Sequence, residues 1–157
     1  MFLKNYTSNV PVSQTIAEIE RMLISCGVQG ITKAYHPNGD VVAVIFHIEV
    51  EGSNCTVRLP ADKEKCQDAL WQDYDESHPK KYRSDRKTRE DFAQQAERTA
   101  WRLQKNWVEV QMSFIQMKQA DYQQVFLPYI YDPRSKTTVY DRIKENGYRA
   151  LLPETTS

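Results

Sequence analysis

The stretch ITKAYHPNGDVVAVIFHIEVEGSNCTVRLP, residues 31–60, decides the fold of this chain. Aliphatic and aromatic residues alternate in it with other residues, which is the period of a β-strand with one buried face. Asn38-Gly39 is a strong signal for a two-residue hairpin turn, and Gly52-Ser53 offers a second tight turn. The stretch therefore predicts an antiparallel meander of three strands over about 30–59.

The two turns predict strand registers that can be checked against each other. The turn at Asn38-Gly39 pairs Lys33 with Val44. The turn at Gly52-Ser53 pairs Ile48 with Val57. We expect one face of the middle strand to form the core, because both registers place the same side chains on it. These side chains are Val42, Val44, Phe46, Ile48 and Val50.

Helical patterns flank the meander. Residues 12–27 carry apolar residues at spacings of three and four, with Ser13 or Thr15 as the candidate N-cap and Gly27 as the stop. A short amphipathic helix is expected over about 62–73.

A charged stretch and two further helices complete the pattern. The stretch 73–87 holds few aliphatic residues and contains a proline, so it is expected to be a loop. Short helices are expected over 121–130 and over 137–147, where Gly147 marks the end.

The longest expected helix begins near Thr88, which Asp91 can cap. About 32 residues at ~1.5 Å each give roughly 48 Å, which exceeds the dimensions of a domain of this size. The helix carries two apolar stripes, so it should contact the sheet and something else: the N-terminal helix, the C-terminal region or another subunit. The first stripe is Ala96, Ala100, Leu103, Trp107, Val110, Phe114 and Met117; the second is Trp101, Val108, Met112 and Ile115. A straight helix of that length would overhang the domain, so either it bends or it supports self-association, and we expect a homo-oligomer.

These elements predict an α+β fold. It consists of an N-terminal helix, a three-stranded antiparallel meander, a long helix that packs on the sheet, and short C-terminal helices. We expect a single domain over residues 1–157. Its parts are the helix and meander (1–60), a charged insert (61–93) and a helical part (94–157).

Composition argues against several classes of protein. Lysine plus arginine and aspartate plus glutamate balance at 21 each, unlike a protein that coats nucleic acid by bulk charge. Three cysteines without a CxxC pair fit a reducing, cytoplasmic compartment. The N-terminus lacks an apolar signal segment, and the longest apolar run, VVAVIF, is too short to cross a membrane.

Motifs for catalysis are missing from the sequence. It contains no Gly-rich phosphate loop, no G-x-S-x-G and no H-E-x-x-H. Cys55, Cys66 and His78 are widely spaced for a zinc site. The carboxylates of DYDE, 73–76, fall in an expected loop, whereas a nuclease holds its metal on rigid strands. We therefore expect no enzyme, no metal and no cofactor.

The segment PKKYRSDRKTRE, residues 79–90, has the most uneven charge in the chain. Its cations could neutralise phosphates, and Tyr82 could stack on a base. Arg98 and Arg102 would extend the basic surface along the helix that follows. The candidate nucleic-acid-binding residues are Lys80, Lys81, Tyr82, Arg83, Arg86, Lys87, Arg89, Arg98 and Arg102.

An alternative is that these cations are neutralised within the chain. The acidic DYDE could fold back on them, and Arg98 and Arg102 could pair with Glu97, Glu109 or C-terminal acids. Sequence alone leaves both interpretations open.

Three strings carry a resemblance to a known family: NVPVSQTIAEIERMLISCGVQGI, VVAVIFHIEVEGSNCTVRLP and AERTAWRLQKNWVEVQMSFIQMKQADYQQVFLPYI. The chain resembles a family of small uncharacterised proteins encoded by bacteriophages and integrated mobile elements, with the part that varies at about 61–93. The resemblance implies a role in phage DNA metabolism or in neutralising a host defence. It implies no catalytic residues.

Together these observations predict a phage accessory protein that binds nucleic acid, in particular single-stranded DNA, during replication or recombination. The alternative hypothesis is an anti-defence protein, similar to an anti-CRISPR, that binds and inhibits a host nuclease. In either case the expected location is the cytoplasm of the bacterial host.

Overall fold

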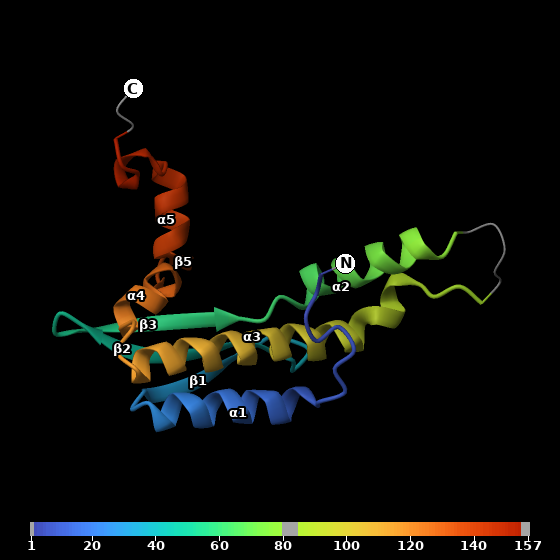
Figure 1. The fold of residues 1–157 in the computed structure, drawn as a ribbon, viewed down its shortest axis with the longest axis horizontal. Helices are drawn as coiled ribbons and strands as arrows, with labels where there is room; N and C mark the ends of the chain where they lie inside the picture. Colours follow the sequence, from blue (N-terminus) through green and yellow to red (C-terminus); the bar gives the residue numbers. More distant parts are fainter. Residues whose placement is uncertain (1, 80–84, 155–157) are drawn as a thin grey trace.

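The computed structural model describes residues 2–79 and 85–154 and has the expected α+β fold. Figure 1 shows helices α1 and α3 lying side by side along the sheet, with α2 projecting at one end and α5 at the other. The main elements are α1 (Val12–Ser25), β1 (Gln29–Tyr35), β2 (Val41–Val50), β3 (Ser53–Pro60), α2 (Lys63–Ser77), η2 (Arg89–Phe92) and α3 (Ala93–Gln116). They are followed by α4 (Tyr122–Phe126), η3 (Leu127–Tyr129), β4 (Tyr131–Asp132), β5 (Thr137–Thr138), α5 (Val139–Asn146) and η4 (Arg149–Leu151).

The meander has the predicted order, β1-β2-β3, and is antiparallel throughout. Lys33 pairs with Val44, as predicted, but the expected two-residue turn at Asn38-Gly39 was wrong. The register shifts between Ala34 and Tyr35, Tyr35 pairs with Val41, and residues 36–40 connect the strands. The second hairpin also differs, because Val50 pairs with Ser53 and the turn residues are Glu51 and Gly52. Both turn residues have positive φ angles, 50° and 79°, and glycine takes the second turn position as in Asn-Gly turns. The register moves by two residues, so the same face of β2 stays inward.

The core lies between that face of β2 and the helices. Val44, Phe46 and Ile48 are buried, together with Val57 and Leu59 of β3. They pack against apolar residues of α1, α3 and α4, namely Ile16, Ile19, Leu23, Trp101, Val108, Met112 and Phe126. The second stripe of α3 therefore faces the sheet.

The N-cap residues agree with the sequence prediction at one of two helix starts. The expectation of Ser13 or Thr15 as the N-cap of α1 was wrong: Pro11 holds that position, and Thr15 lies buried inside the helix. Thr88 and Asp91 form the expected capping box at the start of η2, which leads directly into α3. Helix α3 has 24 residues, about 36 Å at 1.5 Å per residue, so it is shorter than expected.

Helix α2 is longer than expected and continues through Ser77. The acidic DYDE segment, 73–76, is thus helical, contrary to the expected loop. Ring packing explains the extension: Tyr74 stacks on His78 at 4.1 Å and contacts Phe92 at 5.3 Å between centroids. These contacts tie the last turns of α2 to η2.

The chain beyond η3 forms what we call the C-terminal arm, residues 131–154. A small β4–β5 hairpin and α5 build it, and α5 begins at a Thr138–Asp141 capping box and ends at Gly147. None of its side chains is buried. Across residues 2–79 and 85–154, no helix combines the length and apolar character that a membrane span requires.

Phe126, the last residue of α4, packs this helix against the sheet. Its ring meets Phe46 at 5.2 Å and Trp107 at 5.9 Å between centroids, both edge-to-face. We expect Phe126→Ala to lower the free energy of unfolding by about 3–4 kcal/mol, because it leaves a cavity in the core. Leu127→Ala, at a half-exposed neighbour, is the control and should cost under about 1 kcal/mol. Urea denaturation followed by circular dichroism measures both, and equal losses would contradict this packing.

Candidate functional site

The candidate basic surface is only partly within the described residues. Lys80, Lys81, Tyr82 and Arg83 lie outside them. The other five candidates are Arg86, Lys87, Arg89, Arg98 and Arg102, and each has a defined environment.

Arg86 is held inside the α2 end rather than presented to solvent. Its guanidinium pairs with the Asp75 carboxylate and donates to the His78 carbonyl at 2.8 Å. It also lies over the rings of Trp71 and Tyr74, at 5.5 and 5.8 Å from their centroids. Only 14% of the side chain is exposed, so Arg86 braces this end of the helix.

The two other cations of the segment differ from each other. Arg89 pairs with Asp68 at 2.7 Å, and the hydrogen bond to that carboxylate raises the pKa of the arginine. Its carbonyl accepts a hydrogen bond from Gln67 at 3.0 Å. The ammonium of Lys87 lies 5.6 Å from the Phe92 ring centroid, and no carboxylate among the described residues pairs with it.

The cations of α3 connect this helix to the N-terminal part of the chain. Arg98 donates to the Ser8 carbonyl at 3.1 Å, and Arg102 pairs with Glu18 at 2.7 Å. Burial acts to raise the pKa of Glu18, but the hydrogen bonds from Arg102 and Gln14 outweigh it, and the pKa lies below its ordinary value. Arg102 thus joins α3 to α1.

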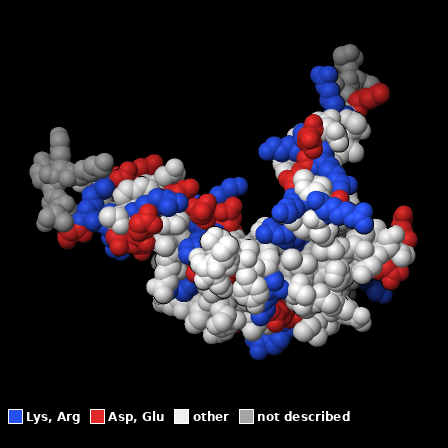
Figure 2. Space-filling view, turned by 180° about the vertical axis from the view of Figure 1, so that it is seen from behind, with Lys and Arg blue, Asp and Glu red and all other residues white. Residues whose placement is uncertain are grey.

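Charge along α2 and the following segment is therefore mixed. Residues 62–92 contain nine acidic and eight basic residues. Figure 2 shows the two signs interspersed over the part described. The described cations do not gather into one open surface. Arg86 pairs with Asp75 of the DYDE segment, as the neutralised alternative expects. Arg98 and Arg102 instead contact Ser8 and Glu18, and not Glu97, Glu109 or a C-terminal acid.

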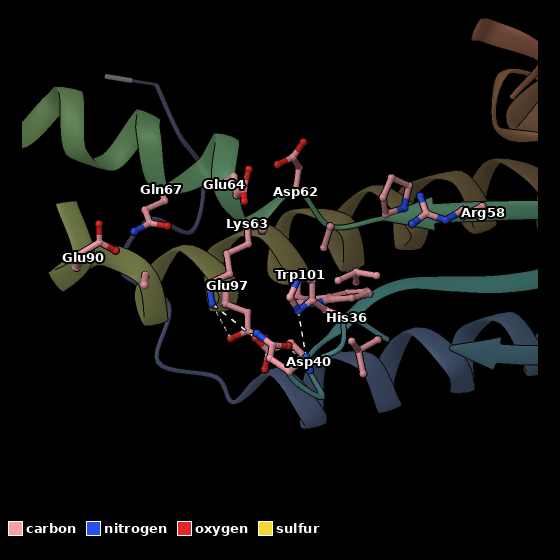
Figure 3. A pocket seen from close by; sticks show the side chains of 17 residues that line it. His36, Asp40, Arg58, Asp62, Lys63, Glu64, Gln67, Glu90, Glu97 and Trp101 are labelled. Atoms are coloured by element: carbon pink, nitrogen blue, oxygen red, sulfur yellow. Dashed lines mark hydrogen bonds and ion pairs between the residues drawn. The ribbon is translucent and has the colours of Figure 1, made fainter. Parts of the chain in front are cut away.

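A polar hollow of about 480 Å³ lies where α2, α3 and the β1–β2 turn meet (Figure 3). Lys63 reaches into it between Asp40, at 3.7 Å, and Glu97, at 3.8 Å. Trp101 lines the hollow and is 1% exposed. Among the residues that the structure describes, no group of three His, Cys, Asp or Glu side chains could hold a metal ion. The lysine already sits between the two carboxylates.

A second, larger hollow is apolar, and we call it the α2–α3 groove. It has a volume of about 730 Å³ and lies between α2, the outer side of α3 and the segment before α1. Its apolar lining includes Leu3, Ala69, Leu103, Trp107, Val110 and Tyr129. Val110 is 49% exposed, so part of the first α3 stripe faces solvent here.

The groove explains why α3 has two apolar stripes. Near its start the first stripe is covered, because Ala96 and Ala100 pack against Cys66 and Leu70 of α2. Beyond Ala100 this stripe lines the groove at Leu103, Trp107 and Val110. The spacing of apolar residues predicted the stripe. The sequence did not show that α2 covers only one end of the stripe.

Comparison with protein-family models, with curated proteins and with solved structures gives no match.

The contacts of Arg86 should stabilise the C-terminal end of α2. Arg86→Ala should lower the free energy of unfolding by about 1–2 kcal/mol, since it removes a partly buried ion pair and two cation–π contacts. Hydrogen–deuterium exchange should show faster exchange of the amides at 74–78. Lys87→Ala, a change to an exposed neighbour, should leave these amides unchanged. Equal amide exchange rates at 74–78 in the two variants would contradict the role of Arg86 in stabilising this end of α2.

The Arg102–Glu18 pair should make the free energy of unfolding depend on pH. Because the folded-state pKa of Glu18 is lowered, the pair stabilises the fold above the unfolded-state pKa of about 4.3 and loses this effect as the pH falls. The stability difference between the natural protein and Glu18→Gln should therefore shrink from pH 7 to pH 3. Urea unfolding at several pH values measures it, and a constant difference would refute the assignment.

Proposed function

We propose that the chain is a protein-binding module that holds an apolar polypeptide segment in the α2–α3 groove. The observation that carries the proposal is the partly exposed apolar stripe of α3 at the base of that groove. Exposed apolar surface rimmed by polar residues is typical of interaction sites. Lys4, Lys65, Gln104 and Gln111 supply such a rim here.

Two features of the groove fit a helical or extended peptide. The groove runs along α3 and has a wall on each side, α2 and the Tyr129 end of η3. Trp107 provides an aromatic floor that Phe126 and Tyr129 hold in place, at 5.9 and 5.3 Å between ring centroids. Rigid aromatic side chains in pockets are frequent binding hot spots.

The described cations favour this proposal over nucleic-acid binding. Arg86, Arg89 and Arg102 are paired with carboxylates, and Arg98 is bound to a carbonyl. Each would have to break these contacts to bind a phosphate. The resemblance to phage proteins adds a setting, in which the partner belongs to a host defence, and this setting is part of the proposal.

A pull-down with matched variants tests the proposal. Tagged protein is incubated with a nuclease-treated bacterial lysate that also contains an untagged copy of the chain. We expect at least one polypeptide to be retained by the natural protein and by Ile24→Asp, an exposed aliphatic on α1, and to be lost with Val110→Asp. Identical retention by both variants would contradict the groove as the binding site.

Nucleic-acid binding is the contrasting outcome. Fluorescence polarisation with a labelled single-stranded oligonucleotide at low salt should show no micromolar binding. Binding that survives Val110→Asp and disappears on charge reversal of Lys80, Lys81 and Arg83 would favour the nucleic-acid hypothesis instead.

A further inference from the structure

We propose that the polar hollow between α2, α3 and the β1–β2 turn binds a basic amino-acid residue. Its guanidinium or ammonium group lies among the carboxylates of the hollow, and its carbonyl accepts a hydrogen bond from Trp101. The volume of about 480 Å³ is in the range of pockets that hold small molecules. This residue is either a free amino acid or part of a polypeptide. The hollow is distinct from the α2–α3 groove, and its occupation does not depend on a polypeptide in that groove.

The lining of the hollow carries an excess of negative charge, because five carboxylates and two cations contribute to it. The cations are Lys63 and Arg58, and Figure 3 shows Arg58 at the opposite end of the hollow from Gln67 and Glu90. A cationic group at the Gln67 end therefore meets mainly carboxylates. The five carboxylates are those of Asp40, Asp62, Glu64, Glu90 and Glu97.

Glu97 is the carboxylate that would gain most from such a ligand. Its side chain is only 20% exposed, and its distance of 3.8 Å from the Lys63 ammonium is too long for a hydrogen bond. The same ammonium lies 3.7 Å from Asp40, so one lysine serves two carboxylates. Asp62 is already occupied as the N-cap of α2. No described residue donates a hydrogen bond to Glu97, and N–H donors of a cationic ligand would supply one in a partly buried place.

Two buried side chains each present an unused hydrogen-bonding atom to the hollow. Gln67 is 5% exposed, and its amide nitrogen donates to the Arg89 carbonyl, whereas its amide oxygen accepts from no described residue. Figure 3 shows the Gln67 side chain pointing from α2 into the hollow. Trp101 is 1% exposed, and its indole N–H donates to no described residue. Both atoms retain access to solvent, and the hollow is the open space that both residues line. The site therefore offers an acceptor for a cationic donor and a donor for a carbonyl.

Nuclear magnetic resonance titration of the isotope-labelled chain measures binding at this site. The probe is arginine blocked as N-acetyl-arginine-N-methylamide, and the citrulline analogue, of the same shape without the charge, is its control. The blocked arginine should shift the indole N–H signal of Trp101 with a dissociation constant below about 1 mM. The indole signals of Trp71 and Trp107, which lie outside the hollow, should stay in place. No shift at about 10 mM probe, or equal binding of the citrulline analogue, would overturn the proposal.

Two substitutions should change the affinity in opposite directions. Glu97→Gln keeps the shape of the side chain and should weaken binding at least ~10-fold, the effect of losing one charge-assisted hydrogen bond. Lys63→Met removes the competing ammonium and should strengthen binding ~3-fold or more. Glu109→Gln, on the same helix but outside the hollow, is the control and should leave the dissociation constant unchanged. Unchanged affinity in Glu97→Gln, or unchanged or weaker binding in Lys63→Met, would contradict a site for cations.

Free arginine distinguishes the two sources of the ligand. Tighter binding of free arginine than of the blocked form identifies the amino acid itself, and tighter binding of the blocked form identifies an arginine within a polypeptide. Either result supports a site for a basic residue. Val110→Asp, in the α2–α3 groove, should leave the titration unchanged, so this site and the groove are tested separately.

Discussion

The structure depends on the burial of one face of β2 against α1, α3 and α4. Phe46, at the centre of that face, is fully buried and meets Phe126 edge-to-face. This contact fixes α4 over the sheet, and with it the start of the C-terminal arm. The second stripe of α3 covers the same face. Its first stripe then lies on another side of the helix, where α2 covers Ala96 and Ala100 and where Leu103, Trp107 and Val110 line the apolar groove.

Several cations of the described residues hold elements of the fold together. Arg102 joins α3 to α1, Arg98 holds the segment before α1, and Arg86 braces the end of α2. Lys33 shows the same pattern at the edge of the sheet, where it pairs with Glu20 at 3.0 Å. A cation that already has a carboxylate or carbonyl partner offers little to a phosphate.

Sequence predicted the fold well where local signals were strong. The alternation in β2, the capping pairs at Thr88 and Thr138 and the stop at Gly147 all have a direct local cause. Prediction was wrong where tertiary contacts decide. The acidic turns of α2 have weak helical signals of their own, and packing of Tyr74 on His78 and Phe92 makes them helical.

The candidate site was less accessible to sequence reasoning. A run of cations is visible in a sequence, but the partner of each cation depends on residues far along the chain, as Arg102 and Glu18 illustrate. The apolar stripe of α3 was visible as a period. Its exposure depends on how far α2 reaches along α3, and no local pattern encodes that distance.

A photo-crosslinking residue at position 110 tests the central claim most directly. With benzoylphenylalanine in place of Val110, irradiation in a bacterial lysate that also contains an untagged copy of the chain should attach a polypeptide to the protein. The same residue placed at position 24 should attach none. Irradiation that attaches no polypeptide at position 110, or the same polypeptide at position 24, would contradict the claim that the groove binds protein.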